Sequence, residues 1–288
     1  MKTIDTVVED IYRLLETKEI PPEVSLEAQC EAFGKAMGDL LLENMQPEED
    51  RSGSLRLSSI GKPDRKIWHA FMGTDQIKLD GPTYIKFLYG HIVEALVLAL
   101  AQIAGHEVTD QQKEVNVEGV KGHTDGRIDG TLMDVKSCSA YGFKKFEHNK
   151  LHLNDDFGYI AQLKAYAQDQ GDTTYAWLAM CKQSGKLALL KYDETDTTAI
   201  YYDAINYDIR ERVRHVKQLV ASDLLPTVCH TPVKDGQSGN ERLATGCVYC
   251  DFKYSCWPDV VKFDYAAGPK YLTKIEREPR VAAYPKEF

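Results

Sequence analysis

Residues 122–136 read GHTDGRIDGTLMDVK, and this stretch predicts both the fold and the chemistry of the chain most directly. Its glycines separate strand-like segments, a pattern typical of tight connections between neighbouring strands. Side chains alternate along a strand, so Asp134 and Lys136 are predicted to share one face. Asp125 comes nine residues before Asp134, where Gly122 and Gly126 allow the chain to bend. We therefore expect two carboxylates and a lysine to converge at the edge of a sheet.

This group of side chains suits the hydrolysis of a phosphodiester bond. Carboxylates are hard oxygen ligands for Mg²⁺ or Mn²⁺. Such an ion lowers the pKa of its bound water and neutralises charge on the phosphate. Lys136 would orient that water or stabilise the developing negative charge. The alternative is an exposed strand face with an ordinary ion pair, and the Asp-x-Lys triplet alone does not separate the two interpretations.

The segments on either side predict an α/β sheet with helices on both faces. Helices are expected over residues 3–17, 25–45, 58–71, 83–105, 155–170 and 195–223. Strand-like segments are EVNVEGV (114–120), HTDGRIDG (123–130), LMDVKSCS (132–139), TYAWLAMCK (174–182) and LALLKYDE (187–194). The helix over 83–105 is apolar nearly all round, which predicts burial against the sheet.

The charge of the chain is unevenly distributed. Residues 1–50 hold 13 acidic and 4 basic side chains and so account for the whole net charge of −9. The remaining residues are neutral as a block but contain basic clusters, such as Lys144 and Lys145. Local fields near a cleft matter more than the total charge, so the composition neither supports nor excludes DNA as a partner. No apolar run approaches the roughly 20 residues that span a bilayer, and the acidic N-terminal stretch has no apolar core typical of a signal peptide.

Four short motifs resemble those of the PD-(D/E)XK superfamily of nucleases, and within it the RecB-like and lambda-type exonucleases. In chain order they are Gly90-His91-Ile92-Val93-Glu94, Gly122-x-x-Asp125-Gly126, Asp134-Val135-Lys136 and Gln162-Leu163-Lys164-Ala165-Tyr166. Each motif is weak alone, but the four follow in the order of that family across residues 90–166. The resemblance implies a restriction-endonuclease-like fold with a mixed central sheet flanked by helices.

The resemblance also implies roles for individual residues. Glu94, Asp125 and Asp134 would hold the metal ion, Lys136 would assist the attacking water, and Gln162 and Tyr166 would support them or touch the DNA backbone. Gln162 and Tyr166 are four residues apart and hence on one face of a helix. His91 lies one turn before Glu94 and could assist it, and a packed or capping role is the alternative. Asp129, in a turn rich in acidic residues, is the alternative to Asp125 as a metal ligand.

Three cysteines near the end of the chain have the spacing of a metal site. Cys247-x-x-Cys250 followed by Cys256 lets several thiolates reach one metal. Some RecB-like nucleases, including CRISPR adaptation nucleases, carry such a triplet and bind a [4Fe–4S] cluster. Their fourth cysteine lies in a segment like C-P-R-x-x-W, which residues 63–68 match without the cysteine. Cys229, Cys30 or His230 would supply the fourth ligand, and a Cys/His set would favour Zn²⁺. Free thiols are the alternative, and Cys138 and Cys181 are expected to pack on strands.

The motifs and the cysteines together predict the domain organisation and the function of the chain. We expect an acidic helical extension over residues 1–50, a nuclease core over 51–225 and a cysteine-containing region over 226–288 packed on that core. The expected function is cleavage of DNA ends by a cytoplasmic exonuclease, of bacterial or viral origin, in recombination, replication or DNA degradation. A helicase, single-strand-binding or recombination protein would be its partner. The rivals are a non-catalytic DNA-binding or scaffolding subunit and a structure- or site-specific endonuclease.

Overall fold

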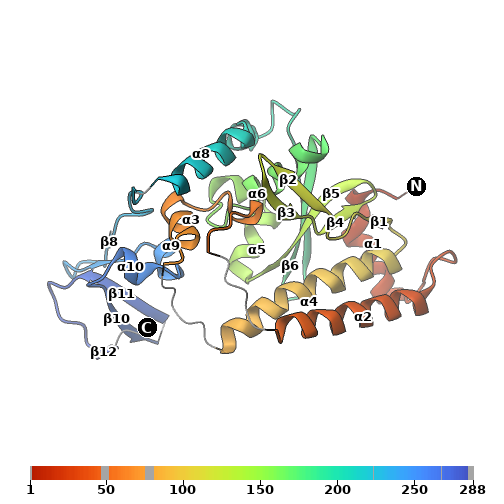
Figure 1. Ribbon diagram of the computed structural model, residues 1–288. Helices are drawn as coiled ribbons and strands as arrows, with labels where there is room; N and C mark the ends of the chain where they lie inside the picture. The colour runs from red at the N-terminus through yellow and green to blue at the C-terminus, as the bar shows by residue number, and fades with distance from the viewer. Residues whose placement is uncertain (1, 47–51, 75–80, 223, 267, 285–288) are drawn as a thin grey trace. The chain divides into compact units, whose positions relative to one another are not determined.

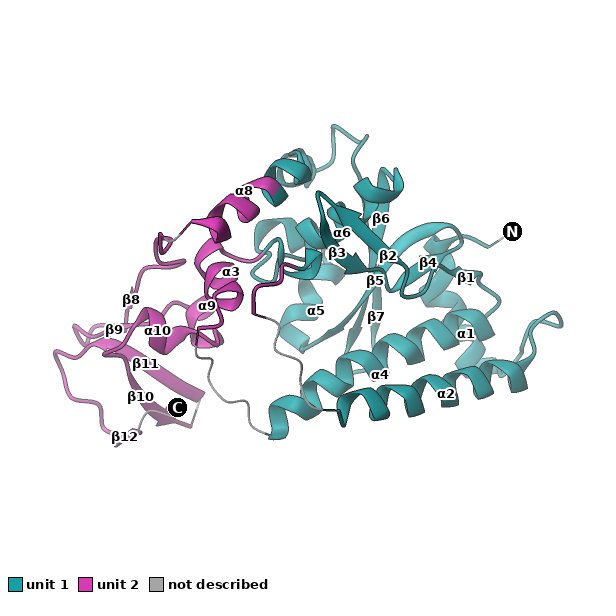
Figure 2. Cartoon of the chain, viewed as in Figure 1, with its two compact units in different colours: residues 1–49, 56–61, 81–213 teal, residues 50–55, 62–80, 214–288 magenta. Residues whose placement is uncertain are grey.

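The computed structural model describes residues 2–46, 52–74, 81–222, 224–266 and 268–284. It divides into two compact units (Figure 2). Unit 1 comprises Met1–Glu49, Arg56–Gly61 and Gly81–Val213, and unit 2 comprises Asp50–Leu55, Lys62–Asp80 and Arg214–Phe288. The three-part division expected from the sequence stays a prediction.

Unit 1 is built on a mixed sheet of five strands in the order β1-β4-β5-β6-β7 (Figure 1). The strands are β1 (Val108–Thr109), β4 (Gly126–Ile128), β5 (Thr131–Cys138), β6 (Thr174–Cys181) and β7 (Leu187–Asp193). Strands β5 and β6 run parallel, and the other neighbouring pairs are antiparallel. A separate hairpin joins β2 (Glu114–Val117) to β3 (Val120–His123). The predicted α/β class with a mixed central sheet flanked by helices is confirmed.

The helical elements of unit 1 flank this sheet. They are η1 (Ile4–Thr6), α1 (Val7–Thr17), α2 (Leu26–Asn44), η2 (Leu57–Ser59), α4 (Gly81–Ile103), α5 (Ala140–Glu147), η3 (Leu151–Leu153), α6 (Tyr159–Gln170) and α7 (Tyr202–Ile205). Helix α8 (Ile209–Ala221) begins in unit 1 and ends in unit 2. Most predicted helices are confirmed within a few residues at their ends.

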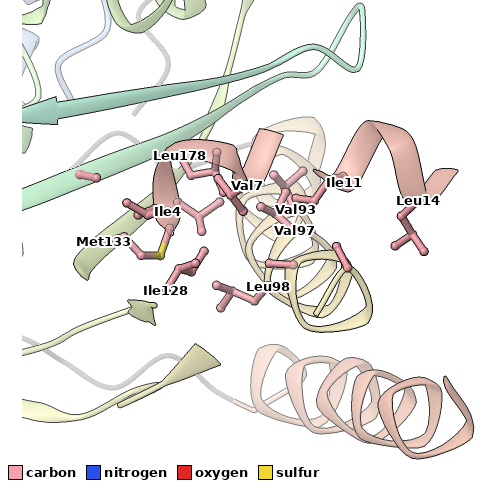
Figure 3. Close-up of a cluster of buried hydrophobic side chains, with 14 residues drawn as sticks. Ile4, Val7, Ile11, Leu14, Val93, Val97, Leu98, Ile128, Met133 and Leu178 are labelled. Carbon is pink, nitrogen blue, oxygen red and sulfur yellow. The ribbon is translucent and has the colours of Figure 1, made fainter. Parts of the chain in front are cut away.

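One face of the sheet is covered by α1 and α4 (Figure 3). Helix α1 repeats apolar side chains at helical spacing, and these pack with the apolar side chains of α4 and the sheet. The buried cluster includes Val7, Ile11 and Leu14 of α1, Val93, Val97 and Leu98 of α4, and Ile128, Met133, Val135 and Leu178 of the sheet. Because Met133 and Val135 point into this core, alternation along β5 turns Asp134 and Lys136 to the opposite face.

The helix expected over 58–71 is divided into Leu57–Ser59 and Asp64–Phe71, and two further expected elements are also divided. The single helix expected over 195–223 is instead the two helices α7 and α8, because Asp208 interrupts the helix and accepts a hydrogen bond from the backbone N–H of Arg210 at 2.8 Å. The segment 114–120, expected as one strand, contains a turn at Glu118 and Gly119. Both have positive φ, of 52° and 83°, and the chain reverses there into β3.

Unit 2 contains a second sheet that the sequence did not predict. Its strands lie in the order β12-β10-β11-β9-β8, and all neighbouring pairs are antiparallel. The elements are α3 (Asp64–Phe71), β8 (Val233–Lys234), β9 (Glu241–Arg242), α9 (Thr245–Val248), α10 (Lys253–Cys256), β10 (Val261–Tyr265), β11 (Gly268–Lys274) and β12 (Ala283–Tyr284). Leu243, Cys247, Val260 and Tyr271 form its small apolar core.

Helix α4 differs from the sequence-based expectation in one respect. By length and composition it could cross a membrane, although no such segment was expected from the sequence. A core helix of a globular protein can have the same length and composition, and one such helix is weak evidence for a membrane protein. In unit 1 the side chains of Val93, Val97, Leu98 and Ala101 of α4 are buried in the protein core.

A close backbone approach fixes the start of α6. Gly158, with φ +76°, precedes α6, and a Cβ atom added there would lie 2.4 Å from the carbonyl carbon of Gly61. We expect Gly158→Ala to lower the free energy of unfolding by about 2–4 kcal/mol, since it adds both a left-handed alanine and a steric clash. Urea denaturation measures this loss.

Gly171→Ala is the matched control for this prediction. Gly171 follows the other end of α6 with φ +77°, but a Cβ atom there would meet nothing within 4 Å. Its substitution should cost only the backbone strain, about 1 kcal/mol. Equal losses in the two variants would show that the contact with Gly61 does not constrain this turn.

Candidate active site

Asp134 and Lys136 form a buried ion pair on β5. The carboxylate oxygen Oδ2 of Asp134 lies 2.6 Å from Lys136 Nζ, and Asp134 is only 1% exposed. Lys136 Nζ also lies 4.5 Å from the ring centre of Tyr159, the first residue of α6. The sequence predicted the shared face of Asp134 and Lys136 but not the contact with Tyr159. Breaking such a pair leaves a charge buried without a partner, which is strongly unfavourable.

Asp125 is held beside this pair by a backbone hydrogen bond. It lies between β3 and β4, and its Oδ2 accepts a hydrogen bond from the N–H of Val135 at 2.8 Å. That bond connects Asp125 to the residue between Asp134 and Lys136. Gly122, three residues earlier, leaves room for Tyr166, because a Cβ atom there would lie 2.7 Å from the Tyr166 ring.

Helix α6 brings Gln162 and Tyr166 to the same site. The Gln162 amide lies 3.4 Å from Oδ1 of Asp134 and 3.3 Å from the hydroxyl of Tyr166. Tyr166 is buried, and burial raises its pKa to about 12, so the phenol stays protonated at neutral pH. The four-residue spacing predicted from the sequence thus places both side chains on the face of α6 that meets β5.

Glu94 reaches the site from α4. Its Oε1 accepts a hydrogen bond from the side chain of Gln112 at 3.0 Å. Burial, followed by the negative charge of Asp134, raises the pKa of Glu94 to about 7. Gln112 was not singled out from the sequence. Its left-handed backbone, with φ 52°, follows β1, and only the folded chain shows that it meets Glu94.

The three carboxylates repel one another electrostatically. The pKa of Asp125 is raised well above its usual value by burial and then by Asp134 and Glu94. Burial also raises the pKa of Asp134, against the opposing effect of Lys136. Burial lowers the pKa of Lys136, but Asp134 and Asp125 raise it by more, so Lys136 stays protonated. A shared cation would relieve the repulsion among the carboxylates.

The oxygen atoms of the three carboxylates are ligands that suit a hard divalent cation, although they do not form a preformed coordination site. Within the described residues, no three His, Cys, Asp or Glu side chains form a ready-made metal site. Asp134 Oδ2 is buried beside Lys136 Nζ at 2.6 Å, and a carboxylate oxygen has lone pairs beyond that one contact. Buried carboxylate oxygens with unused lone pairs are what Mg²⁺ or Mn²⁺ binds in proteins.

The rival residues lie in different surroundings. Asp129, in the turn between β4 and β5, contacts Nδ1 of His106 at 2.7 Å and accepts a hydrogen bond from the N–H of Glu107 at 3.1 Å. Both oxygens of Asp129 are therefore occupied by structural contacts. His91 is exposed on α4. These placements favour Asp125 over Asp129 as the partner of Asp134.

In unit 2, four cysteines lie within electrostatic range of one another. Burial, followed by the neighbouring thiols of Cys250, Cys229 and Cys256, raises the pKa of Cys247 to about 11. All four thiols are free. The Nε of Arg65 lies 3.2 Å from the sulfur of Cys256, so residues 63–68 contact one of these thiols through Arg65.

The other candidates for the cysteine site are placed as follows. His230 lies against the backbone of Gly246, since a Cβ atom on Gly246 would lie 2.6 Å from His230 Nε2. Cys30 is on α2 in unit 1. Cys138 and Cys181 are buried and face each other across β5 and β6, which confirms that they pack on strands.

The raised pKa of Glu94 predicts a pH-dependent effect on stability. A carboxyl group whose pKa rises from 4.5 to about 7 on folding stabilises the protein fully below pH 4.5, and this contribution is lost as the pH rises through 7. We expect Glu94→Gln to unfold at a higher urea concentration than wild type at pH 8. Its free energy of unfolding should be larger by on the order of 1 kcal/mol. The difference should shrink towards pH 4.5. Denaturation in EDTA across this range measures it, and a constant difference would contradict the assignment.

Comparison with known proteins gives distant structural matches. The chain matches no family model and no curated protein. Among solved structures it is similar to SSO0001, with 15% identity and a TM-score of 0.41 over 77% of this chain and 95% of that one. It is also similar to LHK-Exo in complex with dAMP, with 14% identity and a TM-score of 0.40 over 59% of this chain and 91% of that one.

Proposed function

We propose that this chain is a metal-dependent nuclease that hydrolyses phosphodiester bonds of DNA. The observation that carries the proposal is the convergence of five side chains of unit 1, with Glu94 as a sixth that is coupled to them electrostatically. Glu94 comes from α4, Asp125 from the β3–β4 turn, Asp134 and Lys136 from β5, and Gln162 and Tyr166 from α6. A structural ion pair needs only Asp134 and Lys136, and it does not explain why two further, partly buried carboxylates are coupled to it electrostatically.

Each group has a chemical role in this proposal. Asp134, Asp125 and Glu94 would hold Mg²⁺ or Mn²⁺, which when bound supplies an activated water and neutralises phosphate charge. Protonated Lys136 stabilises the negative charge that develops on the phosphate. The Gln162 amide orients the Asp134 carboxylate, and Tyr166 in turn lies within hydrogen-bonding distance of Gln162.

The choice of DNA, and of cleavage from an end, rests on the motif resemblance to RecB-like and lambda-type exonucleases. In this proposal the enzyme acts in the cytoplasm, in recombination, replication or DNA degradation. A helicase, single-strand-binding or recombination protein would present the DNA end to it.

Degradation of end-labelled linear DNA, compared with circular DNA, tests the proposal. Release of label with Mg²⁺ or Mn²⁺, and its absence in EDTA, is the expected result. Cleavage of both forms would instead identify an endonuclease. A wild-type protein that binds DNA but cuts neither form with either ion would support a scaffolding subunit. Substitution of Asp134 then assigns any activity to this site.

We further propose that the cysteines of unit 2 bind a [4Fe–4S] cluster, with Zn²⁺ as the alternative. Cys229, Cys247, Cys250 and Cys256 supply four sulfur ligands, and metal binding would offset the effect of burial, which raises the pKa of the Cys247 thiol. Iron and labile sulfide in anaerobically purified protein would identify the cluster. Zinc alone would identify the alternative, and the absence of both would leave free thiols.

A further inference from the structure

An exposed aromatic ring lies next to the candidate active site. Phe157 stacks on Tyr159 with ring centres 5.4 Å apart and planes inclined by 17°, and Phe157 remains 60% exposed. The Tyr159 ring in turn lies 4.5 Å from Lys136 Nζ. The Phe157 ring centre is therefore no more than about 10 Å from that nitrogen, a span of about three stacked nucleotides at ~3.4 Å each.

The turn that carries Phe157 is held in place by its neighbours. The carboxylate of Asp155 accepts hydrogen bonds from the N–H groups of Tyr159 at 2.9 Å and Ile160 at 2.8 Å, which ties the turn to the start of α6. Gly158 lies in close backbone contact with Gly61. Phe157 is thus an apolar ring presented to solvent in a fixed orientation, and a preorganised ring loses little conformational entropy on binding.

The acidic side chains beside Phe157 are already engaged within the protein. Asp155 is occupied by the hydrogen bonds at the start of α6. Asp156 lies 3.7 Å from Lys145, whose Nζ also donates to the carbonyl oxygen of Asn154 at 2.8 Å. Lys145 thus offsets the charge of Asp156 near the ring, which reduces the repulsion that a phosphate backbone would meet there.

We propose that Phe157 is a stacking platform for an unpaired nucleobase within about three nucleotides of the scissile phosphate. This inference rests on the proposed nuclease function and specifies its substrate, which is a single-stranded or frayed DNA end. Aromatic side chains stack on any base, because every base has a π-face. A base inside a duplex is already stacked on its neighbours, so it reaches Phe157 only after it has been unpaired.

Substitutions at Phe157 separate stacking from mere apolar contact. Phe157→Leu removes the aromatic face but keeps an apolar side chain, whereas Phe157→Tyr keeps the face. Tyr84→Leu, at an exposed aromatic residue near the start of α4, is the control for loss of a surface ring elsewhere. Each variant is compared with wild type on an end-labelled single-stranded oligonucleotide. Binding is measured with Ca²⁺ in place of the catalytic ion, and turnover with Mg²⁺ or Mn²⁺.

We expect Phe157→Leu to raise both Kd and KM about 5- to 100-fold, from the usual strength of base–aromatic stacking, with kcat within about twofold of wild type. Phe157→Tyr and Tyr84→Leu should bind as wild type does. An abasic residue at one position near the labelled end should weaken binding by wild type to a similar degree. The same abasic residue should have little further effect on Phe157→Leu.

Several results would overturn the inference while the nuclease function stands. These are unchanged binding by Phe157→Leu, an equal loss in Phe157→Tyr, or wild-type binding that is insensitive to the abasic residue at every position. A fall in kcat at constant KM would also overturn it, because Phe157 would then act through Tyr159 and Lys136. A wild-type protein that neither binds nor cuts the oligonucleotide would contradict both proposals.

Discussion

Asp134→Asn is expected to lower the rate of DNA hydrolysis by at least about a thousandfold, because the variant lacks the carboxylate on which the proposed metal site is centred. Asp134 is almost completely buried, pairs with Lys136 and lies within hydrogen-bonding distance of Gln162. Asparagine preserves its shape but carries no charge, so the packing around it should survive. Initial rates on end-labelled linear DNA with Mg²⁺ or Mn²⁺ measure the effect.

The structure provides the control for this experiment. Asp39→Asn removes an exposed carboxylate from α2, which contributes no residue to the candidate site, and should cut as wild type does. Thermal unfolding of both variants excludes loss of the fold. A folded Asp134→Asn protein that retains activity would show that the catalytic centre lies elsewhere, whatever the geometry of the carboxylates.

Lys136→Met is expected to affect both activity and stability. Activity should fall about 100- to 1,000-fold, the usual effect of removing one group that stabilises developing negative charge. Stability at pH 8 should fall by about 3 kcal/mol, because the Asp134 carboxylate then lies buried without its cation. The methionine side chain keeps an apolar stem that can lie against the Tyr159 ring, so the substitution removes mainly the charge.

The two effects of Lys136→Met respond differently to pH and to a second substitution. Loss of Lys136 raises the pKa of Asp134 further above its usual value, so the stability of the variant should recover as the pH falls and Asp134 becomes protonated. The double variant Asp134→Asn/Lys136→Met should recover stability at pH 8 but not activity. A double variant as unstable as Lys136→Met would contradict the assigned role of the ion pair.

The variants at Glu94 and Phe157 test features of the site that the Asp134 and Lys136 variants do not test. Glu94 tests the electrostatic coupling among the carboxylates, which is present before any substrate binds. Phe157 tests a contact with substrate outside the reacting groups. A protein in which Asp134 and Lys136 are essential but Phe157 is not would still be a nuclease, with a different preference for the DNA end.

The sequence by itself determined the elements of the site and the faces on which its residues lie. Alternation along a strand placed Asp134 and Lys136 on one face of β5, and helical spacing placed Gln162 and Tyr166 on one face of α6. The apolar stretch of α4 likewise predicted a helix buried against the sheet, which is confirmed for the buried side chains of Val93, Val97, Leu98 and Ala101. Apolar side chains at the start of the helix are instead exposed, namely Tyr84, Ile85, Phe87 and Tyr89. These features depend on neighbours only a few residues apart, and local periodicity records such neighbours directly.

Only the tertiary structure decided which distant residues meet. The hydrogen bond from Val135 to Asp125, the contact of Gln112 with Glu94 and the stacking of Phe157 on Tyr159 beside Lys136 are set by packing of the whole unit. The raised pKa of Glu94 arises in the same way, because desolvation depends on everything that surrounds a side chain and not on its neighbours in sequence. Helix α1 is a further example, since the sequence shows an amphipathic and acidic stretch, but only the folded chain shows that its apolar face packs against α4 and the sheet.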